Sequence, residues 1–406
     1  MSTPGTRSVA LTVLVAALGY FVDIYDLILF LVLRVKSLRG IGVPDAALLR
    51  TGVLLLNVQM VGMLLGGVAW GVLGDRRGRL SVLFGSIFLY SIANLANAFV
   101  TSVPAYAGLR FVAGFGLAGE LGAGVTLVSE IMGREQRGWG TTVVAGVGLC
   151  GAIVAALVGG RFEWRTAYLV GGGLGLSLLA LRLGLRESGI FETACAAGVR
   201  RGEFLGLFTP ASRARRYLGV VLVGVPIWFC LAVLVGLVPE LAAAMGLAAR
   251  PDPARAVLLF YVGASLGDFA SGFLSQVARS RKRILALFLA LTACSVTAYF
   301  TWGRTSLGAL EVTVVALGAS TGYWAVFVTV ASEQFGTNLR ATATTTAPNF
   351  VRGSVVPVTW AFQALAVHVG VARSAAVVGA ATLLVAAGSL LTLEETFGKD
   401  LDYVEE

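Results

Sequence analysis

The sequence predicts an all-α membrane protein with twelve transmembrane helices in two pseudo-symmetric bundles of six, and three observations support this prediction. Hydrophobic residues make up 57% of the chain and charged residues 13%, about half the charged fraction of a soluble domain. The apolar residues form runs of about 20, the length with which a helix crosses a bilayer. A polar peptide also recurs half a chain apart, which indicates two similar halves.

Twelve apolar runs, separated by polar or Gly/Pro-containing joints, mark the expected spans. Their limits are 8–33, 51–73, 80–99, 104–131, 139–160, 166–184, 216–240, 254–278, 284–302, 307–331, 346–367 and 374–392. The first run contains Asp23 and Asp26 and has no small-residue cleavage site. We therefore expect a retained span rather than a signal peptide.

The distribution of Lys and Arg predicts that both termini are cytoplasmic. With that orientation 19 of these residues lie on the cytoplasmic side and ten on the outer side, as the positive-inside rule requires. The basic residues form no single patch, so the net charge of +9 indicates membrane topology rather than nucleic-acid binding. The first outer loop, over 34–50, is basic for its side. Arg outnumbers Lys 28 to 3, which favours a GC-rich bacterium and its inner (plasma) membrane.

A repeated peptide divides the chain into halves. SEIMGREQRGWGTT at 129–142 matches SEQFGTNLRATATT at 332–345 in six of fourteen positions, 203 residues later. Both copies follow a span at a cytoplasmic joint, and six spans separate them, so the halves have parallel orientation. We expect an N-terminal bundle over 1–185, a cytoplasmic linker over 186–215 and a C-terminal bundle with a short tail over 216–406.

Several stretches resemble a known family. GVLGDRRGRL (71–80), after span two, resembles the loop of the major facilitator superfamily, and its basic run recurs at 272–284 after span eight. RESGIFE (186–192) and EETFGKDLDYVEE (394–406) resemble segments of the sugar-porter-like branch. RFVAGFGLAGELGAG (110–124) resembles the span-four signature of metabolite/proton symporters. The resemblance implies the major facilitator fold, in which two bundles rock about a central site, and we expect a monomer.

Charged residues at the cytoplasmic joints are interpreted as an inner gate. In each copy of the repeat an acid ends a span and an arginine follows seven residues later, which resembles the acid–arginine pairs that close the inner gate in this superfamily. In the loop after span two, Gly78 permits a tight turn and an aspartate can cap a neighbouring helix. The predicted gate residues are Asp75, Arg76, Arg79, Glu130, Arg137, Glu333 and Arg340.

Two acids in span one predict a proton-coupling site. An ionisable side chain at mid-bilayer costs ~3 kcal/mol or more. Asp23 and Asp26 share one helix face, and neighbouring carboxylates raise each other's proton affinity. Alternatively, one of the two is a structural partner of an arginine. The Asp-x-x-Asp spacing resembles a motif of aromatic-acid/proton symporters, although Ile-Tyr stands between the acids here instead of Gly-Phe.

Further polar residues inside the spans complete the predicted site. Glu120 in span four and Asp268 in span eight are additional coupling candidates, and Asp268 is alternatively an ion-pair partner of Arg352. Arg110 and Arg352 are predicted to bind an anionic solute through their forked guanidinium groups, although Arg352 could instead snorkel to the cytoplasmic surface and join the inner gate. The other solute-contact candidates, of which the aromatic ones could equally serve packing, are Tyr25, Asn57, Gln59, Trp228, Tyr323, Trp324 and Asn349.

These features predict secondary active transport by alternating access, as proton-coupled symport of a small polar metabolite such as an organic acid. The alternatives are a proton-coupled drug or metabolite antiporter, although span five lacks the Gly-Pro pair typical of such exporters, and a sugar transporter. With one histidine and four scattered cysteines, the chain offers no enzyme site, and we expect no metal and no cofactor. The expected partners are the solute, protons and the lipid bilayer, and no nucleic acid.

Overall fold

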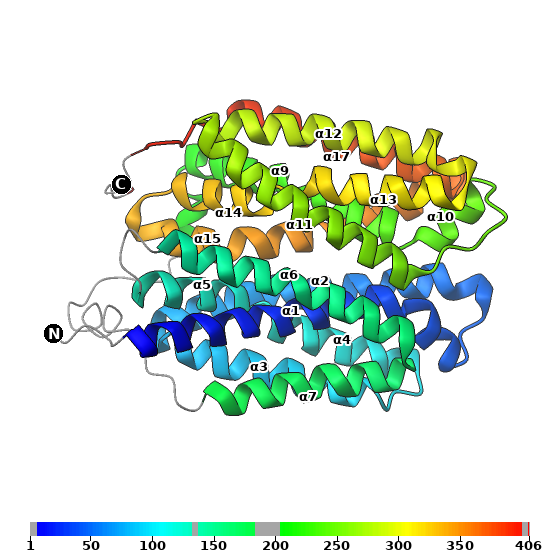
Figure 1. Cartoon of the computed structure of the whole chain (residues 1–406), viewed down its shortest axis with the longest axis horizontal. Helices are drawn as coiled ribbons and strands as arrows, with labels where there is room; N and C mark the ends of the chain where they lie inside the picture. The colour runs from blue at the N-terminus through cyan, green and yellow to red at the C-terminus, as the bar shows by residue number, and fades with distance from the viewer. Residues whose placement is uncertain (1–5, 132–136, 183–203, 400–404, 406) are drawn as a thin grey trace. The chain divides into compact units, whose positions relative to one another are not determined.

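The structure of the chain, a computed structural model, describes residues 6–131, 137–182, 204–399 and 405 (Figure 1). Every regular element in these ranges is helical. By their contacts the described residues form two compact units. The first runs from the N-terminus to Phe204, except that Leu31–Arg34 and Ala46–Val53 group with the second unit, which otherwise comprises Leu205–Glu406.

The helices of the first unit are α1 (Thr6–Gly40), α2 (Leu48–Arg77), α3 (Arg79–Asn97), α4 (Val103–Leu117), α5 (Glu120–Ile131), α6 (Arg137–Arg161) and α7 (Trp164–Arg182). Those of the second unit are α9 (Ala211–Phe229), the π-helix η3 (Cys230–Val235), α10 (Val238–Ala244), α11 (Pro253–Val277), α12 (Arg281–Thr301), α13 (Leu307–Thr321), α14 (Trp324–Glu333), α15 (Thr337–Gly353), α16 (Val355–Val369) and α17 (Val371–Thr392). Short 3-10 turns are η1 (Asp45–Ala47), η2 (Phe204–Phe208) and η4 (Gly303–Thr305).

These helices follow the twelve predicted spans. Nine stretches of the described chain are long and apolar enough to cross a bilayer. The other three predicted spans correspond to α4 with α5, to α6 and to α7. Gly78 separates α2 from α3 with a φ of 95°, a left-handed conformation that favours glycine, so the predicted tight turn is confirmed.

Besides span seven, which turns at Gly236–Leu237 near its predicted end, three spans that the sequence presented as continuous are broken. Span four is interrupted at Ala118–Gly119, span ten at Gly322–Tyr323, and span eleven at Ser354, directly after the turn that carries Arg352. The breaks in spans four and ten occupy corresponding places in the two halves. The first N–H groups of a helix have no intrahelical partner, and at the break in span ten one of them is bound by Asp268 of α11.

Glycines bring two pairs of helices into backbone contact. In the first unit, a side chain on Gly62 or Gly66 of α2 would collide with main-chain atoms of α4. In the second unit, Gly263 and Gly267 of α11 face the main chain of α13 in the same way, and Figure 1 shows these two helices side by side. The second pair of glycines lies 201 residues after the first. The internal repeat therefore extends to the helix packing, which uses small residues as membrane helices commonly do.

Replacing Gly267 with leucine is expected to lower Tm by about 5–10 °C, because an added side chain meets the Ala319 main chain and forces α11 and α13 apart. Thermal unfolding of the purified protein in detergent measures this. Gly272→Leu is the matched control, since nothing lies within 4 Å of a side chain added there on the same helix. Equal losses of Tm in both variants would contradict the close contact between α11 and α13.

The observed length of α1 corrects the sequence interpretation of the first outer loop. The helix continues to Gly40, so Arg34, Lys36 and Arg39 lie on it rather than in a loop. Arg34 is buried, and its Nη2 lies 2.7 Å from Glu240 Oε1. Lys36 Nζ donates to a carbonyl at the end of α6 over 2.8 Å. The basic residues extend the helix because they have acceptors there.

Candidate functional site

Asp23 and Asp26 of α1 are both fully buried. Asp26 interacts electrostatically with Arg110 of α4 and with Asp23. Gly171 of α7 leaves room for the carboxylate, since a side chain at that position would collide with Asp26 Oδ1. Neither oxygen of Asp26 has a hydrogen-bond partner among the described residues. The fold therefore brings the two predicted coupling acids together with the predicted cation of span four.

Arg110 is held by an amide and an aromatic ring. Its Nη2 donates to Gln59 Oε1, and its guanidinium carbon lies 4.8 Å from the centroid of the Phe30 ring, a cation–π geometry. Asn57, two residues before Gln59 on α2, is also buried. Tyr25, in contrast, donates its hydroxyl to a main-chain carbonyl of α7 over 3.0 Å, which fixes its side chain to that helix.

A polar face on α3 was missed by the sequence analysis. Tyr90, Ser91, Asn94 and Asn97 are fully buried, and their side-chain polar atoms have no hydrogen-bond partner among the described residues. Asn94 lies beside Asp26, outside hydrogen-bonding geometry. Their spacing places them on one helical face, and this period within an apolar span was the signal that could have revealed them. The face adds uncharged polar groups to the surroundings of the acids.

A buried ion pair joins the start of α5 to the end of α7. Glu120 and Arg182 form this pair with at most 1% of either side chain exposed. The Ser86 hydroxyl donates to Glu120 Oε2 over 3.4 Å, and Arg182 Nη1 donates to the Leu83 carbonyl over 3.0 Å. Arg182 lies near the end of predicted span six and was not among the predicted site residues. The coupling role of Glu120 stays a prediction.

Replacing Arg182 with methionine is expected to destabilise the protein by about 3–5 kcal/mol, because the Glu120 carboxylate then lies buried without its counter-charge. Adding Glu120→Gln should recover most of the loss. Thermal unfolding of the single and double variants measures both effects. Arg255→Met, which breaks an exposed pair with Glu311, is the control and should change stability by about 1 kcal/mol or less. An Arg182→Met variant as stable as Arg255→Met would contradict the prediction.

In the second unit, Arg352 lies beside two indole rings. Its guanidinium carbon is 5.9 Å from the ring centroid of Trp228 and 5.8 Å from that of Trp324, both within cation–π range. The side chain is 1% exposed, and Nη1 lies 3.4 Å from Asn349 Oδ1. Nε has no hydrogen-bond partner, and no acid of the described residues pairs with this arginine. Four predicted solute-contact residues thus form one cluster, here called the Arg352 cluster: Arg352, Trp228, Trp324 and Asn349.

Asp268 and Tyr323 both bind main-chain groups next to this cluster. Asp268 Oδ1 accepts a hydrogen bond from the Ala325 N–H over 2.9 Å, at the start of α14. Among the ion pairs of the described ranges, none joins Asp268 to Arg352. The Tyr323 hydroxyl donates to the Val223 carbonyl of α9 over 3.0 Å. These two contacts therefore hold the chain at the point where α14, the second half of span ten, begins.

Of the predicted gate residues, Glu333 and Arg340 have described side chains. Glu333 Oε1 lies 3.5 Å from Arg281 Nη2, and its other oxygen accepts from the Thr396 hydroxyl over 2.7 Å. Arg340 Nε donates to the Phe335 carbonyl over 3.3 Å. The side chains that lie outside the described residues are those of Asp75, Arg76, Arg79, Glu130 and Arg137. The gate as a whole stays a prediction.

The chain after α17 is anchored to the start of α12. Glu395 accepts hydrogen bonds from the Ser280 hydroxyl and from the N–H groups of Arg281 and Lys282. Burial raises the pKa of Glu395, but these hydrogen bonds and one from the Phe397 N–H outweigh it, so the pKa lies below its ordinary value. The stabilisation from this contact is thus present at neutral pH and is lost as the pH falls through the lowered pKa.

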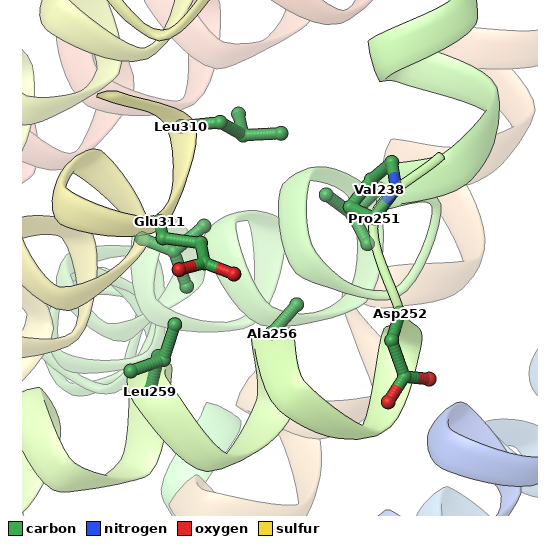
Figure 2. Close-up of a pocket in the computed structure, with 8 residues that line it drawn as sticks. Val238, Pro251, Asp252, Ala256, Leu259, Leu310 and Glu311 are labelled. Atoms are coloured by element: carbon green, nitrogen blue, oxygen red, sulfur yellow. The ribbon is translucent and has the colours of Figure 1, made fainter. Parts of the chain in front are cut away.

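A small pocket of the second unit is separate from these clusters. It is a small open hollow lined by Asp252, Glu311 and six apolar residues (Figure 2). Glu311 pairs there with Arg255 over 2.8 Å. None of the predicted site residues lines it, so it contributes nothing to the predicted solute site.

Metal-ligating side chains do not gather in the described part of the chain. His, Cys, Asp and Glu form no group of three there that could hold an ion. Cys150, Cys230 and Cys294 are free thiols.

Comparisons with known proteins agree on one family. The sequence profile of the Major Facilitator Superfamily matches residues 9–356. A protein of Bacillus subtilis (strain 168) named "Putative niacin/nicotinamide transporter NiaP" is 32% identical over 304 residues, which cover 73% of this chain and 74% of that protein. The 3-(3-hydroxy-phenyl)propionate transporter of Escherichia coli (strain K12) is 28% identical over 307 residues, 72% of each chain. The xylose transporter XylE of E. coli, partially occluded and inward open, matches the fold with a TM-score of 0.77 at 16% identity, over 98% of this chain and 100% of that one.

Proposed function

The chain belongs to the major facilitator superfamily and is a multi-pass membrane transporter of small solutes, and we propose that it takes up an aromatic carboxylate together with a proton. The proposal assigns the solute to the Arg352 cluster and the proton to Asp23 and Asp26. It narrows the organic acid expected from the sequence to one that carries a flat ring.

The observation that carries the proposal is the buried guanidinium of Arg352. A cation inside a membrane span is costly, and no described acid compensates this one. A solute carboxylate supplies the missing charge and can accept two parallel hydrogen bonds from the guanidinium fork. The indole rings of Trp228 and Trp324 flank the same group and offer apolar faces to an aromatic ring.

The names of the relatives support this class of solute. Niacin, named for the B. subtilis protein, is a pyridine carboxylic acid. The E. coli relative is named for 3-(3-hydroxy-phenyl)propionate, a phenyl carboxylic acid. A neutral sugar would leave Arg352 without a counter-charge, so we favour an organic acid over a sugar.

The acids of α1 account for proton coupling. Two carboxylates and the Arg110 guanidinium carry a net charge of −1, and binding one proton makes this group neutral. With the positive charge of Arg352 included, the site is neutral when it is empty and when both the proton and the solute anion are bound, whereas either one alone leaves a net charge. A net charge buried inside the membrane is costly, so the carrier alternates access only when it is empty or fully loaded. Glu120 stays a further predicted coupling residue, held in its ion pair with Arg182.

The test is the external pH of a weakly buffered suspension of de-energised cells that express the protein. Adding nicotinate or 3-(3-hydroxyphenyl)propionate should alkalinise the medium, whereas nicotinamide and xylose should not, and cells without the protein serve as the blank. Acidification on adding the acids would indicate an antiporter instead. No pH change with any aromatic acid would overturn the proposed symport.

A further inference from the structure

Asp268 of α11 is half-buried, and its carboxylate binds main-chain groups of another helix. Its Oδ1 accepts the Ala325 N–H over 2.9 Å, and the Trp324 N–H also faces the carboxylate. The first N–H groups of a helix have no intrahelical acceptor. Because α14 begins inside a membrane span, water cannot readily replace an acceptor there. Asp268 therefore caps α14 from a neighbouring helix.

The packing around the break in span ten leaves few other ways to cap α14. Tyr323, the residue before α14, makes no side-chain cap of its own helix, since its hydroxyl is bound to the Val223 carbonyl. A side chain on Gly322 would collide with the main chain of α11, including the Asp268 nitrogen at 2.5 Å. The end of α13 thus lies directly on the segment of α11 that carries the aspartate.

The capped turn also carries a residue of the proposed solute site. Trp324 is the first residue of α14, and its ring lies 5.8 Å from the Arg352 guanidinium carbon. It also packs on Phe327, one turn further, with ring centroids 5.2 Å apart. Whatever fixes the first turn of α14 therefore fixes the indole beside Arg352.

We propose that Asp268 is a positioning residue, whose carboxylate holds the start of α14 and thereby keeps Trp324 against Arg352. This inference rests on the proposed function for its link to the solute, but the cap itself does not depend on it. It assigns Asp268 a role different from that of Asp23 and Asp26. An asparagine retains an acceptor oxygen of nearly the same shape and loses only the charge, whereas a leucine loses the acceptor.

The first arm of the test requires no solute. Hydrogen–deuterium exchange of the full-length protein in lipid nanodiscs, followed in peptides that contain Trp324 and Ala325, reports the cap directly. We expect Asp268→Leu to speed exchange there about tenfold and Asp268→Asn to stay within about twofold of wild type. The matched control is Asp252→Leu, which removes the cap that Asp252 provides for α11 and should leave exchange in α14 unchanged. Unchanged exchange in Asp268→Leu would overturn the proposal.

The second arm measures transport of nicotinate in proteoliposomes. Asp268→Leu should raise KM about tenfold, as expected for a lost helix cap, and Asp268→Asn should retain both KM and uphill accumulation. An Asp268→Asn variant that exchanges nicotinate but no longer accumulates it would overturn the proposal, because it would make Asp268 a proton carrier. Absence of nicotinate transport by the wild type would contradict the proposed function alone, and the exchange arm would still decide the role of Asp268.

Discussion

Replacing Asp26 with asparagine is expected to abolish uphill accumulation of the solute while leaving solute exchange intact. Asparagine cannot take up a proton, so the group it forms with Asp23 and Arg110 stays neutral whether or not a proton is available. The loaded carrier can then still reorient, but its movement no longer depends on the proton gradient. Counterflow in proteoliposomes measures exchange, and uptake driven by an imposed pH gradient measures accumulation.

The control for Asp26→Asn is the same substitution at Asp45, an exposed residue whose carboxylate pairs with Arg39. Asp45→Asn should keep both activities. An Asp26→Asn variant that still concentrates solute against its gradient would remove Asp26 from the coupling mechanism.

Replacing Arg352 with glutamine is expected to reduce kcat/KM for an aromatic carboxylate by about 30-fold or more, because losing one member of a buried charge pair costs about 2–5 kcal/mol. Arg352→Lys should lose less, since it keeps the charge but not the planar fork. Initial uptake rates over a range of nicotinate concentrations measure the effect, and binding of nicotinate and nicotinamide can be compared in the same variants.

Arg304→Gln is the control for the loss of a positive charge, since Arg304 is exposed. It should leave kcat/KM unchanged. If Arg352→Gln still favours nicotinate over nicotinamide as strongly as the wild type does, Arg352 does not bind the carboxylate.

Much of the fold could be predicted from the sequence because the bilayer imposes strong rules on composition and length. Runs of about 20 apolar residues mark spans regardless of packing. The turn at Gly78 was predictable for a similarly local reason, since the chain there needs a left-handed residue. The breaks in spans four and ten were not predicted. Both breaks fall inside apolar runs, and the acceptor found at the break in span ten, Asp268, lies 57 residues from the N–H that it binds.

The charged members of the candidate site could be picked out from the sequence, but their partners could not. A charge within an apolar run is visible in the sequence, which is how Asp26 and Arg352 were found. The partner of a charge is not visible when it comes from another helix. Arg182, 62 residues after Glu120, was not predicted as its partner. Asp268 gave no sign that its partner is a main-chain N–H 57 residues away.

The central claim is that an aromatic carboxylate moves inward with a proton, and one measurement tests it most directly. Purified protein in proteoliposomes is given an inward proton gradient without a membrane potential, and the internal concentration of labelled nicotinate is followed. The account predicts accumulation above the external concentration, which collapses when a protonophore is added. Equilibration to the external concentration, unaffected by the gradient or the protonophore, would contradict it.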